Sequence, residues 1–311
     1  MIGCGNADYA GEQISPARSA VHHGRHASDP AVVALVKHRE PCGNGTPEVV
    51  CSGVLIGERL VLTAAHCVPG SPRGELEVRF GEWPDADPDH YRGIAASQIH
   101  PSYDRQYDDH DLALLWLNAA APAQPVPLPG AGLGEIGAGR AARVVGFGQA
   151  GGATGSAGEE LEGTVDITSV GSATLTYEPA AAMTCRGDSG GPLFIEVERA
   201  WLLAGITTSG DVACEREGVA VRVDVHEADF VLPNQSPSAW PPPPSDDDCV
   251  QGACGPLGAE CRCGQACPEA TNAASAGPQG CALGHSKTTP ALPIVLFAAI
   301  RFGRRCKRRY D

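Results

Sequence analysis

Apolar residues along this chain gather in short runs, which turn-forming Gly, Pro, Asn and Asp residues separate. Short runs rich in Val, Leu and Ile, bounded by such residues, are typical of β-strands. No window shows the sustained helical periodicity of a long amphipathic helix. We therefore predict strands at Ala31–Val36, Val49–Leu55, Leu60–Thr63, Leu76–Phe80, Ile94–Ile99, Leu112–Leu117, Ala142–Gly146, Gly163–Ser169, Pro192–Ile195, Trp201–Thr207 and Val219–Val223.

The spacing of these runs predicts an all-β domain built as a barrel or a sandwich. A Pro-, Gly- and Ala-rich stretch, Ala119–Gly139, divides the runs into two groups, as a connection between two barrels would. Pro237–Asp248 is rich in proline and ends in aspartates, which predicts a stiff, solvated linker. The chain thus divides into a leader or pro-segment (1–20), a folded domain (21–235), a linker (236–248), a Cys-rich segment (249–287) and an apolar and basic tail (288–311).

Composition and charge narrow the function classes. The 311 residues include 39 Gly and 26 Pro, which fit many short strands and turns. The net charge is −14, and six of the 23 Lys and Arg residues lie in the last eleven positions, so the rest of the chain is strongly acidic. Because phosphate binding needs clustered Lys and Arg, we expect no nucleic-acid partner. The 13 cysteines show no metal-ligand spacing and predict disulfides formed in an oxidising compartment.

Both ends of the chain carry features of export. Met1-Ile2-Gly3-Cys4 resembles the end of a bacterial lipoprotein signal, in which lipid is attached to the Cys; a chance Gly-Cys pair is the alternative. At the other end, cysteines, the apolar run Ala291–Ile300 and a basic cluster resemble the sorting tails of myxobacterial exported proteins. The apolar run is shorter than the roughly 20 residues that span a membrane, and a tail without a role is the alternative. We expect an exported protein, in the cell envelope or outside the cell, with membrane or surface attachment through Cys4 or the tail.

Three segments carry residues with the chemistry of nucleophilic catalysis. Leu60–Cys67 reads LVLTAAHC, Asp111–Leu115 reads DLALL, and Cys185–Leu193 reads CRGDSGGPL. A serine hydroxyl is a poor nucleophile until a base removes its proton, so a His and a Ser with an orienting Asp form a reactive set. In the order His, Asp, Ser, these segments resemble the motifs of the chymotrypsin/trypsin family of serine proteases. The resemblance covers about residues 21–235 and implies two packed antiparallel β-barrels.

The resemblance implies a catalytic triad of His66, Asp111 and Ser189. It assigns the oxyanion hole to the backbone N–H groups of Gly187 and Ser189. The neighbouring Asp108 and Asp109 are alternative partners for the histidine, but the family's strand sequence follows Asp111. We therefore expect a serine endopeptidase that acts on protein or peptide substrates, as a monomer.

The family's layout also implies a substrate pocket. Met183, six residues before the nucleophile, is placed at its base, where the trypsin branch has Asp. Because no carboxylate would then face a bound cation, we expect an apolar residue before the scissile bond. The other substrate-binding positions are Thr184, Thr208, Gly210 and Gly218.

Two disulfides and an activation step follow from the same resemblance. The disulfides are Cys51–Cys67 and Cys185–Cys214, which leaves Cys42 without a family partner. Family members become active when a new α-amino group pairs with the Asp before the nucleophile, here Asp188. Val21-His22-His23-Gly24 aligns loosely with the family's mature start, so we expect a zymogen with Val21 as its new terminus.

We expect no cofactor and no metal in the catalytic site. The acids Glu82, Asp85, Asp87 and Asp89 resemble the family's calcium loop, but an acidic, solvated loop is the simpler interpretation. Four other histidines are expected to face solvent: His22, His23, His26 and His110. A catalytically inactive homologue that acts as a binding module is the alternative function, because this fold also hosts such proteins.

Overall fold

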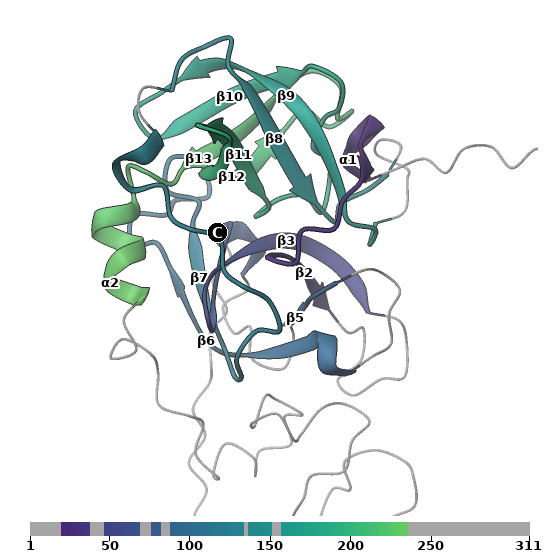
Figure 1. Cartoon of the computed structure of the whole chain (residues 1–311), viewed down its shortest axis with the longest axis vertical. Coiled ribbons are helices and arrows are strands. Elements are labelled where there is room, and N and C mark those ends of the chain that lie inside the picture. The colour runs from purple at the N-terminus through teal and green to yellow at the C-terminus, as the bar shows by residue number, and fades with distance from the viewer. Residues whose placement is uncertain are drawn as a thin grey trace, which may run out of the picture. The chain divides into compact units, whose positions relative to one another are not determined.

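Two sheets, each closed on itself, form nearly all of the regular structure (Figure 1). The protein is represented by a computed structural model, which describes residues 20–37, 47–68, 76–81, 88–133, 136–150 and 157–235. Neighbouring strands are antiparallel throughout both sheets. The structure therefore confirms the predicted all-β class with two packed antiparallel barrels.

The first barrel is formed by the N-terminal half of the domain. Its hydrogen-bonded order is β2-β3-β4-β7-β6-β5, and β5 closes the ring by pairing with β2. The strands are β2 (Val32–Lys37), β3 (Glu48–Gly57), β4 (Leu60–Thr63), β5 (Leu76–Arg79), β6 (Tyr91–Ile99) and β7 (Ala113–Leu117).

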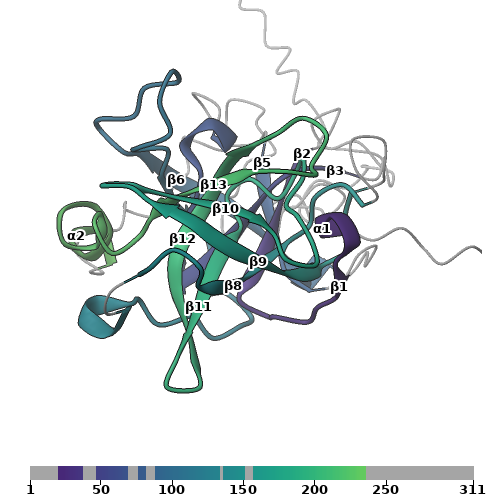
Figure 2. The same ribbon diagram turned by 90° about the horizontal axis from the view of Figure 1, so that it is seen from above.

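The second barrel follows in the chain and closes through the pairing of β8 with β9. A short strand, β1 (Arg25–His26), adds to its edge by pairing with β9, so that Arg25 lies opposite Glu162 (Figure 2). The barrel strands are β8 (Ala141–Gly146), β9 (Leu161–Val170), β10 (Thr174–Pro179), β11 (Pro192–Val197), β12 (Ala200–Gly210) and β13 (Gly218–Arg222).

Helices are short throughout the part of the chain that is described. They are α1 (Ala20–His23), η1 (Ala65–Cys67), η2 (Pro88–His90), η3 (Gly130–Leu133), the π-helix η4 (Glu227–Val231) and α2 (Leu232–Gln235). The last of them is fixed to the first barrel, because the Gln235 side-chain amide donates to the Ile56 carbonyl at 2.8 Å. Among the described helices, none has the length and apolarity that crossing a membrane requires.

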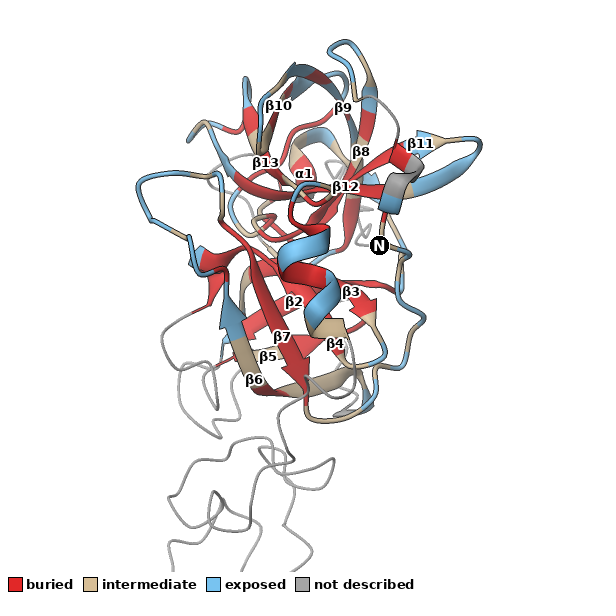
Figure 3. Ribbon diagram, turned by 90° about the vertical axis from the view of Figure 1, so that its left-hand side faces the viewer, coloured by how far each residue is buried: buried red, intermediate tan, exposed pale blue. Residues whose placement is uncertain are grey.

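Burial explains why several strands read as continuous apolar runs. Every residue from Val32 to Val36 is buried, because one face of β2 lines its own barrel and the strand also contacts β8 of the other barrel. The core of the first barrel continues through this contact into Phe147 and Phe194 of the second. A second cluster fills the other barrel, and exposed positions concentrate in the loops (Figure 3).

Each predicted run overlaps a strand, but β1 and β10 were not predicted. β1 has only two residues, both exposed, so it carries no apolar signal. β10 lies between a Gly-Ser-Ala turn and a run of alanines, and only Leu175 and Tyr177 of its six residues are buried. The alternation in β10 is therefore too short to stand out from its surroundings.

Both disulfides that the resemblance implied are present. Cys51 on β3 bonds to Cys67 at the end of η1, with their Cα atoms 6.1 Å apart. Cys185 bonds to Cys214, with a Cα–Cα distance of 5.1 Å. The first bond fixes the helical turn that carries His66 to the neighbouring strand, and the second joins the segment before Ser189 to the loop after β12.

Other predictions fall on residues outside the described ranges. These are the Cys4 leader, Cys42, the acids Glu82, Asp85 and Asp87, and the linker, Cys-rich segment and tail at 236–311. They remain predictions. Asp89, the fourth proposed calcium ligand, is described and lies exposed in η2.

Replacing Cys51 and Cys67 together by serine should lower the free energy of unfolding. The pair closes a loop with a sequence separation of 16, and the chain-entropy model gives about 3 kcal/mol for such a loop. Urea unfolding of oxidised protein measures the change. The Cys185→Ser/Cys214→Ser variant, which opens a loop with a sequence separation of 29, is the comparison. A loss below about 1 kcal/mol would show that the bond constrains the unfolded chain far less than its loop length implies.

Candidate active site

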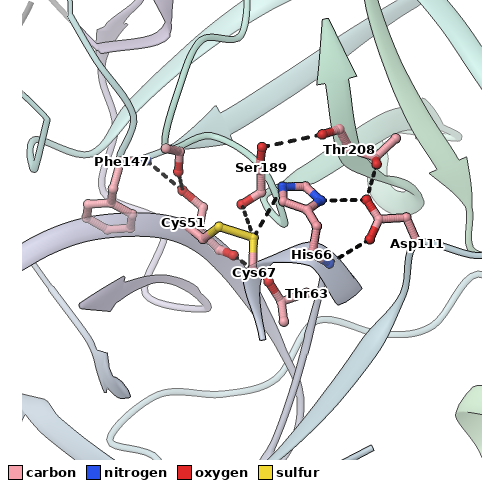
Figure 4. Close-up of a disulfide and its surroundings, with 10 residues drawn as sticks. Cys51, Thr63, His66, Cys67, Asp111, Phe147, Ser189 and Thr208 are labelled. Carbon is pink, nitrogen blue, oxygen red and sulfur yellow. Dashed lines mark hydrogen bonds and ion pairs between the residues drawn. A yellow bond between two sulfur atoms is a disulfide. The ribbon is translucent and has the colours of Figure 1, made fainter. Parts of the chain in front are cut away.

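The imidazole of His66 and the carboxylate of Asp111 form the centre of the site (Figure 4). His66 lies in η1, directly after β4, and Asp111 lies just before β7. Since β4 and β7 are paired strands, their ends meet at one edge of the first barrel. Nδ1 of His66 is 2.6 Å from Oδ2 of Asp111, and the His66 backbone N–H donates to Oδ1 at 2.9 Å. The carboxylate therefore fixes both the ring and the main chain of the histidine.

Asp111 is held in its ionised form although its side chain is only 4% exposed. Burial alone would raise its pKa, but the hydrogen bond and charge interaction with His66 and a hydrogen bond from Thr208 outweigh that effect. The pKa of Asp111 therefore lies below its ordinary value. The Thr208 hydroxyl, which the sequence assigned to substrate binding, donates to Oδ2 of this carboxylate.

The two neighbouring aspartates have other partners. Asp108 accepts a hydrogen bond from the Ser209 hydroxyl at 2.8 Å. Asp109 is exposed, and its backbone carbonyl faces Nε2 of His226 at 3.0 Å. Of the three acids, Asp111 is the one that contacts the His66 ring.

Ser189 lies at a tight turn where the second barrel meets the first. The turn needs glycine at two positions: Gly187 has φ +95° and Gly190 has φ +84°. A Cβ on Gly190 would also lie 2.1 Å from Oγ1 of Thr63, closer than any side chain permits. The Ser189 hydroxyl contacts the Thr208 carbonyl at 3.4 Å, and Figure 4 shows it beside the imidazole of His66.

Ser52 of β3 connects the nucleophile turn to the first barrel. Its backbone N–H donates to the Ser189 carbonyl at 2.8 Å, and its hydroxyl donates to the Gly187 carbonyl at 2.8 Å. The same hydroxyl accepts from the Phe147 N–H at 2.9 Å. With these carbonyls held toward Ser52, the N–H groups of Gly187 and Ser189 have no hydrogen-bond acceptor within the described ranges.

Asp188 is a fully buried carboxylate, 1% exposed, beside the nucleophile. Its oxygens accept from the backbone N–H groups of Cys185 and Gly148, each at 2.8 Å. Burial raises the pKa of Asp188 to about 7, and the two hydrogen bonds only partly offset that effect. No ion pair to Asp188 forms among the residues that the structure describes.

The segment around Val21 is packed into the second barrel. Val21 is fully buried, and its side chain lies with Ala182 against Gly163 of β9. The next residue, His22, accepts a backbone hydrogen bond from Met183 at 2.9 Å. The predicted mature terminus therefore lies beside the segment around Met183, between β10 and the nucleophile turn.

A pocket of about 140 Å³ opens next to Ser189. Two of the predicted substrate-binding residues, Thr184 and Gly210, line it. Met183 and Gly218 do not appear in its described lining; Met183 is 1% exposed and packs in the core of the second barrel. Asp211 also lines the pocket, and its Oδ1 accepts the backbone N–H groups of Glu215, Arg216 and Glu217.

Tyr177 of β10 is a fully buried residue that the sequence analysis missed and that supports the pocket residue Thr184 from behind. Its hydroxyl is 2.7 Å from Oγ1 of Thr184, and its ring lies against Gly218, where a Cβ would approach within 2.4 Å. Burial raises the pKa of Tyr177 to about 12, so the hydroxyl is neutral. The sequence signal was the Leu-Thr-Tyr alternation of β10, but only the pairing of β10 with β13 places the ring beside Gly218.

The prediction that four histidines face solvent is wrong for two of them. His23 and His26 are exposed, whereas His22 and His110 are half-buried. The His110 ring stacks on His100, with centroids 4.8 Å apart, and its Nδ1 is buried without a partner. Both errors arise because a polar sequence neighbourhood does not show which loops pack together.

Comparison with known proteins shows which family the sequence of this chain matches. The Trypsin family profile matches residues 20–230, well over half of the chain. CLIP domain-containing serine protease B4 of Anopheles gambiae is 29% identical over 60% of this chain and 61% of its own length. Vitamin K-dependent protein C of Mus musculus is 30% identical over 53% of this chain and 41% of its own length. The inactive serine protease scarface of Drosophila melanogaster is 33% identical over 25% of this chain and 13% of its own length.

The chain thus spans less than two thirds of the length of these curated relatives. The profile match nevertheless covers both barrels, from α1 to η4. The chain belongs to the trypsin family of serine proteases.

Proposed function

We propose that this protein is a serine-type endopeptidase with His66, Asp111 and Ser189 as its catalytic triad. The observation that carries the proposal is the buried carboxylate of Asp111, 2.6 Å from the ring of His66, with Ser189 beside that ring. In this role the carboxylate keeps Nδ1 protonated, so that Nε2 offers its lone pair as a base. Ser189 attacks the scissile carbonyl while His66 takes its proton and later gives it to the leaving amine. No cofactor enters these steps.

The N–H groups of Gly187 and Ser189, which have no acceptor in the described part of the chain, supply the oxyanion hole in this mechanism. A tetrahedral intermediate carries its negative charge on one oxygen, which two fixed donors stabilise. Ser52 supports this role, because its bonds to the carbonyls of Gly187 and Ser189 orient the main chain on either side of the turn. Rotation of the Ser189 hydroxyl away from the Thr208 carbonyl, a long contact at 3.4 Å, directs it to His66.

An inactive homologue is the alternative, since one relative is named an inactive serine protease. Such a protein needs only the fold and its binding surfaces, not a complete reacting set. Here the His66–Asp111 pair, the adjacent Ser189 and the two unpaired N–H groups occur together. This combination favours the enzyme.

Asp188 and Val21 support a zymogen. A carboxylate that is fully buried with only two backbone donors is costly unless a cation pairs with it. Val21 is already packed in the second barrel, so a cut before it would create an α-amino group close to the nucleophile turn. We propose that this group pairs with Asp188 and stabilises the active arrangement.

We propose an apolar preference for the residue before the scissile bond. Thr184 and the buried Tyr177 hydroxyl bond to each other at one side of the pocket, and neither carries a charge. Asp211 is the acid in the lining, but its Oδ1 accepts three backbone N–H groups and its Oδ2 lies 3.9 Å from Nε of Arg216. An arginine or lysine side chain would therefore lose its hydration without gaining a free carboxylate.

We further propose that the protein is exported, acts as a monomer on protein or peptide substrates, and is held at the cell surface by its tail or by Cys4. The disulfides of the catalytic domain support an oxidising compartment. Fractionation after deletion of residues 288–311 tests the tail's contribution to location.

Replacing Ser189 by alanine should abolish peptide hydrolysis, with a fall in kcat on the order of 10⁶, because the triad acts as a unit. A serine-directed phosphonate should label the processed wild-type protein at Ser189 and leave the variant unlabelled. Mass spectrometry of the adduct and a peptide-cleavage assay measure both effects. Processed wild-type protein that forms no adduct and cleaves no peptide would favour the inactive homologue.

A pair of chromogenic substrates that differ only in the residue before the scissile bond tests the pocket. We expect kcat/KM for Leu to exceed that for Arg by about tenfold or more, because the desolvated cation lacks a partner. The Asp211→Asn variant is the matched control for the pocket's remaining acid. A tenfold preference for Arg would contradict the proposal. If that preference disappeared in the Asp211→Asn variant, Asp211 would be the group that binds the substrate's positive charge.

Asp188 should make the unprocessed protein less stable as the pH rises. Its pKa is 3.8 in the reference state and about 7 in the fold, so between these values the folded chain keeps a proton that the unfolded chain releases. Rising pH then favours unfolding, by a few kcal/mol over that window. The difference in unfolding free energy between wild type and Asp188→Asn, measured from pH 4 to pH 7, isolates this contribution.

The pH dependence changes when the proposed amino group pairs with Asp188. In protein processed at Val21 the carboxylate is stabilised as an anion, so the decline relative to Asp188→Asn should disappear. Unprocessed wild-type protein that gains stability relative to the variant over the same window would contradict the buried, unpaired state of Asp188.

A further inference from the structure

Three histidines from separate loops meet behind the catalytic acid. His100 follows β6, His110 directly precedes Asp111, and His226 precedes η4. The His100 and His110 rings are stacked, and the His226 ring lies edge-on to both, with centroids 4.9 and 5.1 Å away. We call these three residues the histidine cluster. The catalytic mechanism proposed above uses none of them.

Two of the rings hold a buried nitrogen that has no hydrogen-bond partner among the described residues. His226 places Nε2 3.0 Å from the Asp109 carbonyl, which can only accept, so Nε2 carries the proton and Nδ1 holds a lone pair. That Nδ1 and the Nδ1 of His110 are both buried and unpartnered. A buried polar atom without a partner destabilises the fold, and a ligand would offset that cost.

We propose that the histidine cluster binds a divalent transition-metal ion of the zinc class. The candidate ligand atoms of the three rings lie within 4.8 Å of one another. Zinc–nitrogen bonds of 2.0–2.1 Å in a tetrahedral site place nitrogens about 3.3 Å apart. Binding therefore requires the stacked rings of His100 and His110 to tilt until their nitrogen lone pairs converge on the ion. His100 joins by giving up the long contact, 3.2 Å, that its Nδ1 accepts from the Ser102 N–H.

The surroundings of the cluster suit such an ion. The His226–Asp109 hydrogen bond fixes the ring and its tautomer in the way that backbone carbonyls orient metal-binding histidines. Phe230 packs against His100 at 4.7 Å between ring centroids and forms an apolar wall. The exposed carboxylate of Asp229 acts electrostatically on both His100 and His226, so it can balance part of the ion's charge.

The second group of close ligand atoms, Cys51, His66 and Cys67, does not offer the same chemistry. Its two sulfurs are bonded to each other and provide no thiolate. The histidine cluster also contacts the segment that carries Asp111: the His100 N–H donates to the Leu112 carbonyl at 2.9 Å, and His226 holds the Asp109 carbonyl. A bound ion would therefore brace the residues on both sides of the triad acid.

Metal titration of the chelator-treated full chain, with its disulfides oxidised, tests the proposal without an activity assay. Zn²⁺ stoichiometry by calorimetry is compared between wild type, His226→Gln and His110→Phe. Glutamine keeps a donor for the Asp109 carbonyl, and phenylalanine keeps the stacking on His100, so both changes remove mainly a ligand. Co²⁺ as a probe should give visible bands of a nitrogen-ligated site, distinct from the thiolate charge-transfer band that cysteine ligands produce.

We expect each variant to lose one bound ion per chain or to bind it at least about tenfold more weakly, as is typical when a metal's coordination is disturbed. His26→Gln, at an exposed ring, and His66→Ala, in the triad, should keep that ion. Thermal midpoints of the cluster variants in chelator should match wild type, and zinc should raise the midpoints of wild type and the two controls but not those of the cluster variants. Unchanged stoichiometry and affinity in both cluster variants would overturn the proposal, whether or not the protein is a protease.

Discussion

The contact between Ser52 and the nucleophile turn is the constraint on which the site depends. A single residue of the first barrel holds the carbonyls of Gly187 and Ser189 and also accepts from Phe147 of the second barrel. The approach is so close that Gly190 has no room for a side chain against Thr63. Because His66 is attached to one barrel and Ser189 to the other, the distance between base and nucleophile is set by this interface rather than by either barrel alone.

Two buried carboxylates, those of Asp111 and Asp188, lie near this interface, and their surroundings shift their pKa values in opposite directions. Asp111 receives side-chain hydrogen bonds from His66 and Thr208, which keep it ionised. Asp188 receives two backbone N–H groups, which leave its pKa near neutrality. The ionised carboxylate of Asp111 is already stabilised by its partners. Burying the Asp188 carboxylate as an anion still costs free energy, which a cation could offset.

The sequence predicted the parts of the protein that depend on local pattern and short motifs. The run Val49–Leu55 forms a strand whose residues from Cys51 onward are buried on both faces. His66 and Asp111 meet because β4 and β7 are paired. The roles of Tyr177, Ser52 and the histidine cluster could not be predicted, since each depends on register or on packing between loops distant in the chain. Thr208 shows the same limit: its position was expected in the pocket, but its hydroxyl turns to Asp111.

The two-residue strand β1 limits how far the chain near Val21 can move. By pairing with β9 it anchors the chain a few residues after Val21, whatever happens upstream. An amino end created at Val21 would therefore be a short tether rather than a free peptide, with an effective concentration in the millimolar range or above at the second barrel. Its capture would be an intramolecular event, and dilution of the protein into a large volume would not reverse it.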